Sequence, residues 1–165
     1  MPIFLHVGCG MKRKNRTTAG FNTPDWQEYR LDIDPTFNPD IVGSITDMSA
    51  VADNSMDALY SSHNIEHLYP HEVQIALKEF LRVLRPDGFA IVTCPDLQSV
   101  AELVAQDKLT EPAYQSPAGP VSPLDILYGY RPALASGDLF MAHRTGFTLR
   151  SLMAALRESG FSNIF

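Results

Sequence analysis

The feature that most constrains the fold is a short apolar run that ends in a glycine turn. Residues 3–7 (IFLHV) are followed by Gly8-Cys9-Gly10, a pattern typical of a buried strand that enters a tight turn. Further strands are predicted at residues 28–33, 40–45, 56–62 and 89–94. Helices are predicted at residues 70–84, 96–108, 122–130 and 148–160. Alternating strands and helices favour an α/β fold, in which a mostly parallel sheet carries helices on both faces.

The strongest helix signal lies in residues 70–84. Its apolar residues recur at helical spacing and form one stripe, made of Val73, Leu77, Phe80, Leu81 and Leu84. Pro70 marks the start of this helix, and Arg85-Pro86-Asp87-Gly88 marks its end. Two later helices have polar residues at their starts, Asp96 and Thr148, which are good N-caps.

Length and composition limit the class of protein. The chain has 165 residues, which suits one domain with a substantial core. Its net charge of −6 disfavours nucleic acid as a partner, since such surfaces are usually basic. No apolar stretch is long enough to span a membrane, and the N-terminus lacks a signal-peptide pattern. The two cysteines, Cys9 and Cys94, are predicted to be free thiols one strand apart, so the expected location is cytoplasmic.

Parallel α/β sheets bind ligands beyond the carboxyl ends of their strands. The first strand ends in a glycine turn, where the backbone can approach a ligand closely, although the pattern G-x-G-x-x-G fails at Arg13. The second strand ends in Asp32-Ile33-Asp34, and an acid at about this distance from the glycines grips the hydroxyls of a ribose. After the third strand, the Asp47 carboxylate and the Met48 N–H are placed to meet an adenine. Each of these residues has an ordinary structural explanation as well, as a turn, cap or surface loop.

Four segments, taken in order, resemble the class I S-adenosylmethionine-dependent methyltransferases: LHVGCG, RLDIDP, SITDMSAVADNSMDALYSSHNIEHL and ALKEFLRVLRPDGFAIVTCPDL. The resemblance covers residues 3–97, and residues 143–161 resemble a later helix and strand start of the same domain. Within this family, the chain is most similar to small bacterial methyltransferases of the type encoded with cell-surface polysaccharide genes. The resemblance implies one Rossmann-like three-layer sandwich over residues 1–165, S-adenosylmethionine as the cofactor, and a small-molecule or saccharide-type acceptor.

The resemblance also implies a set of site residues. Those expected to bind the cofactor are His6, Gly8, Cys9, Gly10, Asp32, Ile33, Asp47, Met48 and Ser62. His63 ends the fourth strand, where the methyl group is transferred, and its imidazole titrates near neutrality, so it is the first candidate for a general base. His143 is the second candidate. Residues 110–146, rich in proline, are expected to form an insertion or a lid over the acceptor.

The chain departs from the family in three places. His6 stands where an acid is common, and Lys12 replaces the third glycine of the usual turn. The sequence ends at GFSNIF, so the final antiparallel hairpin is expected to be incomplete, and an open sheet edge allows a homodimer. These departures leave open an alternative, a non-catalytic cofactor-binding or interaction protein on a degenerate methyltransferase fold.

A second alternative comes from residues 63–67 (HNIEH), which match the H-x-x-E-H signature of inverzincin zinc hydrolases. That site requires His63 and His67 on one face of a helix, with a third ligand available. Residues 56–62 are predicted to be a strand, and Pro70 marks the next helix, so the segment is expected to be a loop. The methyltransferase interpretation explains the motif as the segment after the fourth strand, and no metal ligand is assigned.

Overall fold

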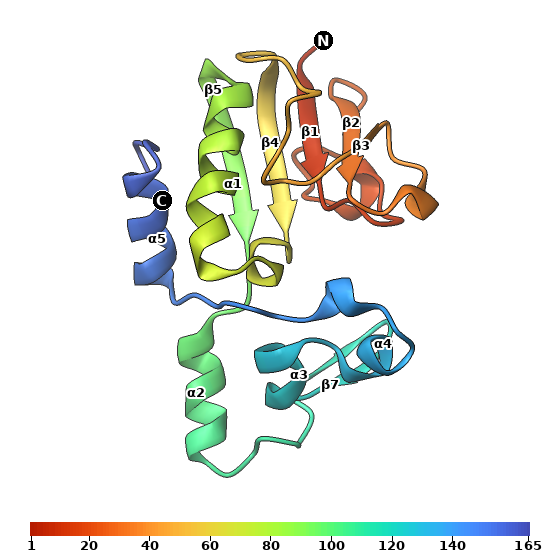
Figure 1. Ribbon diagram of the computed structural model, residues 1–165, viewed down its shortest axis with the longest axis vertical. Coiled ribbons are helices and arrows are strands. Elements are labelled where there is room, and N and C mark those ends of the chain that lie inside the picture. Colours follow the sequence, from red (N-terminus) through yellow and green to blue (C-terminus); the bar gives the residue numbers. More distant parts are fainter.

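The computed structural model describes residues 1–165 and contains one five-stranded sheet (Figure 1). Its strands are β1 (Ile3–Val7), β2 (Gln27–Asp32), β3 (Ile41–Val42), β4 (Met56–Ser62) and β5 (Leu84–Thr93). They lie in the order β3-β2-β1-β4-β5, and every neighbouring pair is parallel. This arrangement confirms the expected Rossmann-like α/β fold. The strand order reverses between β1 and β4, so their carboxyl ends are the expected ligand site.

Two strands differ by more than one residue from their predicted ranges. β5 begins at Leu84, because the chain stays extended after the helix and Leu84 pairs with Met56, with an irregular register before Ala58. The helix ends before Pro86 and Gly88, as predicted, but these two residues belong to β5 and not to a loop. β3 covers only two of the six residues predicted for it at 40–45. Beyond it, Ser44 O accepts a hydrogen bond from Asp47 N at 3.1 Å, which turns the chain out of the sheet.

One face of the sheet carries the main core and two helices, α1 (Pro70–Val83) and α5 (Leu149–Glu158). The predicted stripe of α1 is buried against the sheet at Val73, Leu77 and Phe80, whereas Leu81 is 37% exposed at the edge. The last helix begins at its predicted cap, because the Thr148 side chain accepts a hydrogen bond from Ser151 N. Leu152 and Leu156 of α5 pack against the same core.

The opposite face of the sheet is covered by an aromatic loop. Phe21 stacks on Phe4 with ring centroids 4.2 Å apart, and Trp26 packs edge-on against both rings. This loop contains the 3₁₀ turn η1 (Lys14–Arg16). His6 belongs to this face, since residues of a strand alternate between faces. Its ring contacts Tyr60 edge-on, and its Nδ1 lies 2.8 Å from a carboxylate oxygen of Glu28.

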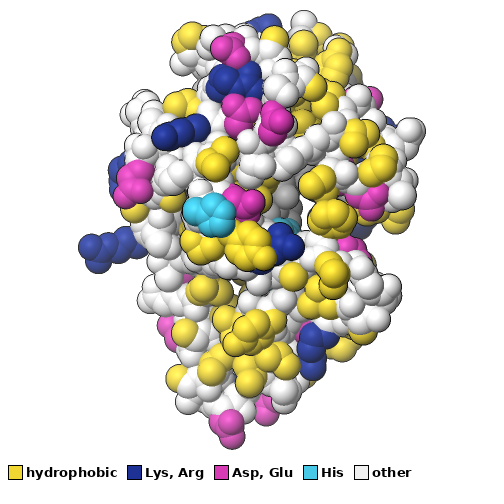
Figure 2. All heavy atoms as spheres, viewed as in Figure 1, with side chains coloured by type: hydrophobic (Ala, Val, Ile, Leu, Met, Phe, Trp, Pro, Cys, Tyr) yellow, Lys and Arg dark blue, Asp and Glu magenta, His cyan; other side chains and the backbone are white.

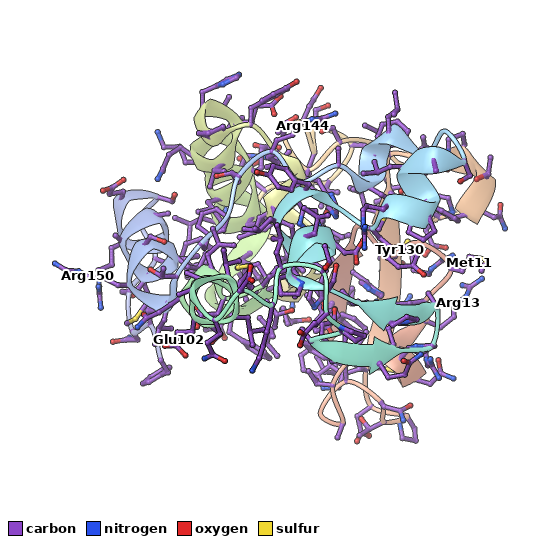
Figure 3. The ribbon with its side chains drawn as sticks, turned by 90° about the horizontal axis from the view of Figure 1, so that it is seen from below. Met11, Arg13, Glu102, Tyr130, Arg144 and Arg150 are labelled. Carbon is purple, nitrogen blue, oxygen red and sulfur yellow. The ribbon has the colours of Figure 1, made fainter.

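The remaining elements form a lobe beyond the carboxyl ends of the strands (Figure 1). They are α2 (Leu97–Ala105), β6 (Tyr114–Ser116), β7 (Gly119–Val121), α3 (Pro123–Tyr128), α4 (Arg131–Ala135) and the 3₁₀ turn η4 (Leu139–Met141). Seen from below, the hairpin β6–β7 and Tyr130 lie on the side of Met11 and Arg13, and Arg144 lies toward α1 (Figure 3). Apolar side chains gather on the outer surface of this lobe (Figure 2), and Tyr128 and Phe140 are among its exposed residues. No helix of the structure combines the length and hydrophobicity that a membrane span requires.

The lobe is stabilised internally by a buried carboxylate. Asp125 is 4% exposed and accepts hydrogen bonds from the Arg131 side chain and from Ser122 N and Oγ. The Arg131 guanidinium, followed by the Ser122 bonds, holds the pKa of Asp125 well below its usual range. Such a carboxylate stabilises the folded state above its unfolded pKa of about 4, and this contribution is lost as the pH falls.

We therefore expect Asp125→Asn to lower the melting temperature most at neutral pH. The difference from wild type is expected to shrink as the pH falls below about 4, because the unfolded wild-type chain then binds a proton at Asp125 that the folded state does not bind. Thermal unfolding followed by circular dichroism between pH 3 and pH 8 measures both effects. The matched control is Glu111→Gln on the exposed surface, for which no pH-dependent difference is expected; an equal difference at every pH would contradict the assignment.

Candidate functional site

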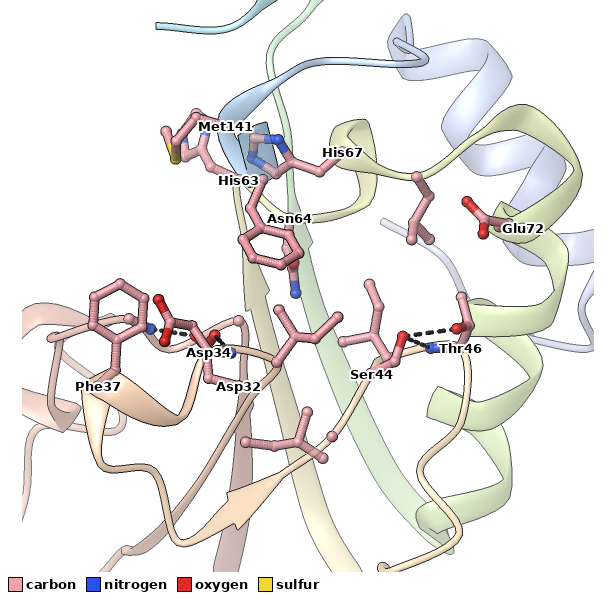
Figure 4. Close-up of a pocket in the computed structure, with 18 of the residues that line it drawn as sticks. Asp32, Asp34, Phe37, Ser44, Thr46, His63, Asn64, His67, Glu72 and Met141 are labelled. Atoms are coloured by element: carbon pink, nitrogen blue, oxygen red, sulfur yellow. Dashed lines mark hydrogen bonds between the residues drawn. The ribbon is translucent and has the colours of Figure 1, made fainter. Parts of the chain in front are cut away.

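A cavity of about 320 Å³ lies between the strand ends and the lobe. Its walls come from the glycine turn, the end of β2, the segment after β3, the segment after β4, and residues 138–144 of the lobe. The close-up shows Asp32 and Asp34 at one end and His63, His67 and Met141 at another (Figure 4). The pocket therefore lies where the reversal of strand order predicts a ligand.

The glycine turn needs glycine at position 8 for two reasons. Gly8 has a φ of +58°, and a Cβ placed there would come within 2.4–2.6 Å of the side-chain amide of Asn64. Gly10 has a φ of +50° and donates its N–H to Asp32 Oδ2 at 2.7 Å. Both glycines line the pocket, so the backbone of this turn is open to a ligand.

Two carboxylates follow β2. Asp32 is 7% exposed, and its second oxygen accepts a hydrogen bond from Asp34 N at 3.0 Å. Asp34 accepts a hydrogen bond from Thr36 N at 2.8 Å, and the Thr36 side chain, followed by this backbone bond, lowers the pKa of Asp34. Asp32 thus ties the glycine turn to the loop after β2, while each of its oxygens keeps lone pairs for a ligand.

Sequence reasoning missed Arg30, which holds this side of the pocket in place. Its guanidinium is 1% exposed and donates to the backbone carbonyls of Gly10, Lys12, Phe37 and Asn38. It therefore links the loop after the glycine turn to the loop after β2. The only sequence signal for Arg30 is that a charged residue stands inside a strand that is predicted to be buried.

The segment after β3 enters the pocket directly after the strand, at Gly43, which is earlier in the sequence than predicted. Ser44, Ile45 and Thr46 line the cavity, whereas Asp47 and Met48 do not. Met48 is fully buried, and its N–H already donates to Glu79 Oε2 at 2.8 Å. The Asp47 carboxylate lies in a shallow surface hollow beside α1 and accepts a hydrogen bond from Ser49 N. The short length of β3 is the cause, because the chain turns at Ser44.

The segment after β4 contributes two histidines to the pocket, His63 and His67. His63 follows the strand with a φ of +52°, a left-handed conformation that is uncommon for residues other than glycine. Its side chain is 55% exposed, and its Nδ1 lies 3.3 Å from Glu66 Oε1. Residues 65–67 form the single 3₁₀ turn η3 (Ile65–His67), so His63 and His67 do not share a helical face as the inverzincin site requires.

The lobe is attached to the pocket at this turn. Arg144 N donates to Glu66 O at 2.8 Å, and the Arg144 guanidinium donates to His67 O at 3.1 Å. The same guanidinium lies over the ring of Tyr69, 4.8 Å from its centroid. These contacts place Phe140, Met141 and Arg144 opposite the strand ends, where they close the pocket.

Comparison with known proteins identifies the family. A family model described as a methyltransferase domain matches residues 5–92, which is more than half of the chain. The chain belongs to the class I S-adenosylmethionine-dependent methyltransferases. No curated protein sequence matched the chain.

Solved structures support the fold of this methyltransferase domain. An S-adenosylmethionine-dependent methyltransferase from Archaeoglobus fulgidus has 16% identity and a TM-score of 0.58, over 98% of this chain and 62% of its own. One from Thermotoga maritima has 16% identity and a TM-score of 0.61, and the match covers 99% of this chain and 65% of that protein. A third structure is the 1,6-didemethyltoxoflavin-N1-methyltransferase of Burkholderia thailandensis, with bound 1,6-didemethyltoxoflavin and S-adenosylhomocysteine. It has 16% identity and a TM-score of 0.55, and the match covers 99% of this chain and 62% of that protein. The chain thus spans less than two thirds of the length of each.

The pocket of the methyltransferase domain fits its cofactor, S-adenosylmethionine. The turn at Gly8 forms a cradle that any Cβ would fill, and the Asn64 Nδ2 beside it is buried without a hydrogen-bond partner. The carboxylates of Asp32 and Asp34 are placed to accept hydrogen bonds from ribose hydroxyls. The cavity volume is at the lower end of the range of about 300–1,000 Å³ that is usual for small-molecule sites.

Besides Asp47 and Met48, four predicted site residues do not line the pocket: His6, Cys9, Ser62 and His143. Burial, which outweighs the opposing bond to Glu28, lowers the pKa of His6 on the far face of the sheet. Burial also raises the pKa of the Cys9 thiol to about 11, so this thiol stays protonated. The Ser62 hydroxyl accepts a hydrogen bond from Thr93 at 3.0 Å. His143 lies behind His67, with ring centroids 4.8 Å apart.

Proposed function

We propose that this domain transfers the methyl group of S-adenosylmethionine to a hydroxyl of a neutral small-molecule or saccharide-type acceptor. The observation that carries the proposal is the position of His63, which lies in the same pocket as the glycine turn and Asp32. When bound, the cofactor supplies an electrophilic methyl group on a sulfonium, so the chain has to position the two reactants and remove the acceptor proton.

His63 is the group that we assign to proton removal. Glu66 Oε1 lies 3.3 Å from its Nδ1 without the geometry of a hydrogen bond, and the negative charge of this carboxylate favours the tautomer with a proton on Nδ1, which leaves the Nε2 lone pair available. The left-handed backbone of His63 carries strain of a kind that clusters at active sites.

The charges of the pocket favour an uncharged acceptor. Its walls contain the carboxylates of Asp32, Asp34, Glu72 and Asp138 but one cation, Arg144. The basic residues of the loop after the glycine turn do not line it, and the Lys14 ammonium donates to the backbone carbonyls of Thr23 and Trp26. A phosphorylated acceptor would meet net negative charge here, whereas the carboxylates can accept hydrogen bonds from the hydroxyls of a neutral sugar.

Turnover with a panel of acceptors tests the proposal. Formation of S-adenosylhomocysteine is measured with neutral saccharides and with the corresponding sugar phosphates, and faster turnover is expected with the neutral set. Calorimetric titration with S-adenosylhomocysteine measures cofactor binding separately. Cofactor binding without turnover on any acceptor would favour the non-catalytic alternative, and absence of cofactor binding by the folded chain would overturn the proposal.

A histidine substitution tests the proposed base. His63→Gln is expected to lower kcat by about 100-fold, the lower end of the range for general base catalysis, and to leave the affinity for S-adenosylhomocysteine unchanged. His71→Gln, an exposed histidine at the start of α1, is the matched control and is expected to keep full activity. Equal kcat values for the two variants would exclude His63 as the base.

A further inference from the structure

Three potential metal ligands meet where the lobe contacts the turn η3. One carboxylate oxygen of Glu66 and one imidazole nitrogen each of His67 and His143 lie within 4.8 Å of one another. Glu66 and His67 belong to the turn after β4, and His143 comes from the far end of the lobe. The group therefore exists only because the chain returns to the sheet after the lobe.

Glu66 is the unusual member of this cluster. Its side chain is 1% exposed, and neither of its carboxylate oxygens has a hydrogen-bond partner. Burying an ionised carboxylate without compensation costs several kcal/mol, so buried charges are generally paired or bound to a metal. The half-exposed His63 ring approaches Oε1 at 3.3 Å without hydrogen-bond geometry, so both oxygens stay without a partner.

Each of the two histidines lies within hydrogen-bond distance of a backbone carbonyl through its Nδ1. His67 Nδ1 lies 3.2 Å from Ala142 O, and His143 Nδ1 lies 2.6 Å from Ile126 O. A carbonyl oxygen can only accept, so each Nδ1 carries the proton and each neutral ring keeps a free lone pair on Nε2. Histidines that bind metals usually donate their other ring N–H to a backbone carbonyl or a carboxylate in this way.

We propose that Glu66, His67 and His143 bind one divalent transition-metal ion of the zinc class. Two imidazoles and one carboxylate suit zinc or ferrous iron, whereas magnesium and calcium prefer oxygen ligands. Tetrahedral bonds of about 2.0–2.2 Å to the ion place ligand atoms roughly 3.4 Å apart, so ligand atoms at the 4.8 Å limit of the cluster have to approach one another by about 1.4 Å. This proposal replaces the sequence-based expectation that the chain has no metal ligand, and the ligand set differs from that of the H-x-x-E-H hypothesis.

The ion would lie beside the acceptor end of the pocket. His67 lines the cavity together with His63 and Met141 (Figure 4), and three protein ligands leave coordination positions open. An acceptor hydroxyl that bound at such a position would have a lower pKa, which would assist the transfer of its proton to His63. This role rests on the proposed methyl transfer, but the binding of metal does not.

Calorimetric titration of the EDTA-treated full chain with zinc chloride tests the site. One zinc ion per chain is expected, with magnesium giving no signal at the same concentration. Glu66→Gln and His143→Asn are each expected to weaken zinc binding by 100-fold or more, and the exposed His71→Gln is the matched control with unchanged affinity. Cobalt(II) added in place of zinc is expected to give visible absorption bands in the wild type that both ligand variants lose. Absence of stoichiometric zinc binding, or binding that survives both ligand substitutions, would overturn the site.

Thermal unfolding separates a metal site from a merely structural carboxylate. In EDTA, Glu66→Gln is expected to melt at a higher temperature than wild type, because the substitution removes a buried charge without a partner. Zinc is expected to raise the melting temperature of wild type and not that of Glu66→Gln. A lower melting temperature for Glu66→Gln with and without zinc would contradict the proposal. If zinc binds but S-adenosylhomocysteine does not, the proposed function fails and the metal site stands.

Discussion

Replacing Asp32 with alanine is expected to lower the affinity for S-adenosylhomocysteine by about 100-fold or more. The substitution removes a carboxylate that is placed to accept two ribose hydroxyls, and hydrogen bonds to a charged group contribute about 1.5–3 kcal/mol each. It also leaves Gly10 N and Asp34 N without their acceptor, so the glycine turn loses its link to the loop after β2. Calorimetric titration with S-adenosylhomocysteine measures the loss directly.

Two further variants separate the ribose contact from the support of the turn. Asp32→Asn keeps the shape and one acceptor oxygen but removes the charge, so its affinity is expected to fall between that of wild type and that of the alanine variant. Asp87→Ala, an exposed acid at the opposite end of the sheet, is expected to bind S-adenosylhomocysteine as wild type does. Unchanged affinity in Asp32→Ala would show that the cofactor does not use the end of β2.

Replacing Arg30 with methionine is expected to lower the free energy of unfolding by about 3 kcal/mol or more. Methionine fills much of the same volume but donates no hydrogen bonds, so four backbone carbonyls lose a charged donor. The loss is concentrated in two loops that border the pocket. Affinity for S-adenosylhomocysteine is therefore expected to fall together with stability, although the Arg30 guanidinium does not line the cavity.

Urea unfolding followed by circular dichroism measures this effect, with S-adenosylhomocysteine titration at low urea as the second readout. Arg16→Met, in the exposed turn η1, is the matched control, and a change within about 0.5 kcal/mol is expected. Arg30→Lys keeps the charge but not the planar fork, so it is expected to recover only part of the stability. A stability loss in Arg30→Met no larger than that in Arg16→Met would show that the loops do not depend on the guanidinium.

The metal site and the proposed base share one carboxylate. Glu66 has two oxygens, so one can face His63 while the other faces His67 and His143. Glu66→Gln is accordingly expected to affect zinc binding and turnover together, whereas His143→Asn affects turnover only if the ion takes part in methyl transfer. Comparison of the two variants therefore tells whether the ion belongs to the reaction or only attaches the lobe to the sheet.

Local sequence patterns determined most helices and strands, and those pocket residues that lie directly at strand ends. The stripe of α1, the caps at Asp96 and Thr148, and the strand at residues 56–62 are read from periodicity and capping residues, which depend on near neighbours alone. Gly8, Asp32 and His63 lie in the pocket because each comes directly at the end of a strand, and parallel strands bring these ends together.

Only the tertiary structure decided the rest of the site. Ser44 and Thr46 line the pocket instead of Asp47 and Met48 because β3 stops after two residues, and strand length depends on the pairing partner rather than on local pattern. The carbonyls that Arg30 contacts come from two separate loops. The cluster of Glu66, His67 and His143 requires the lobe to fold back on the turn after β4. Contacts between residues so distant in the sequence follow from packing, and no local pattern encodes them.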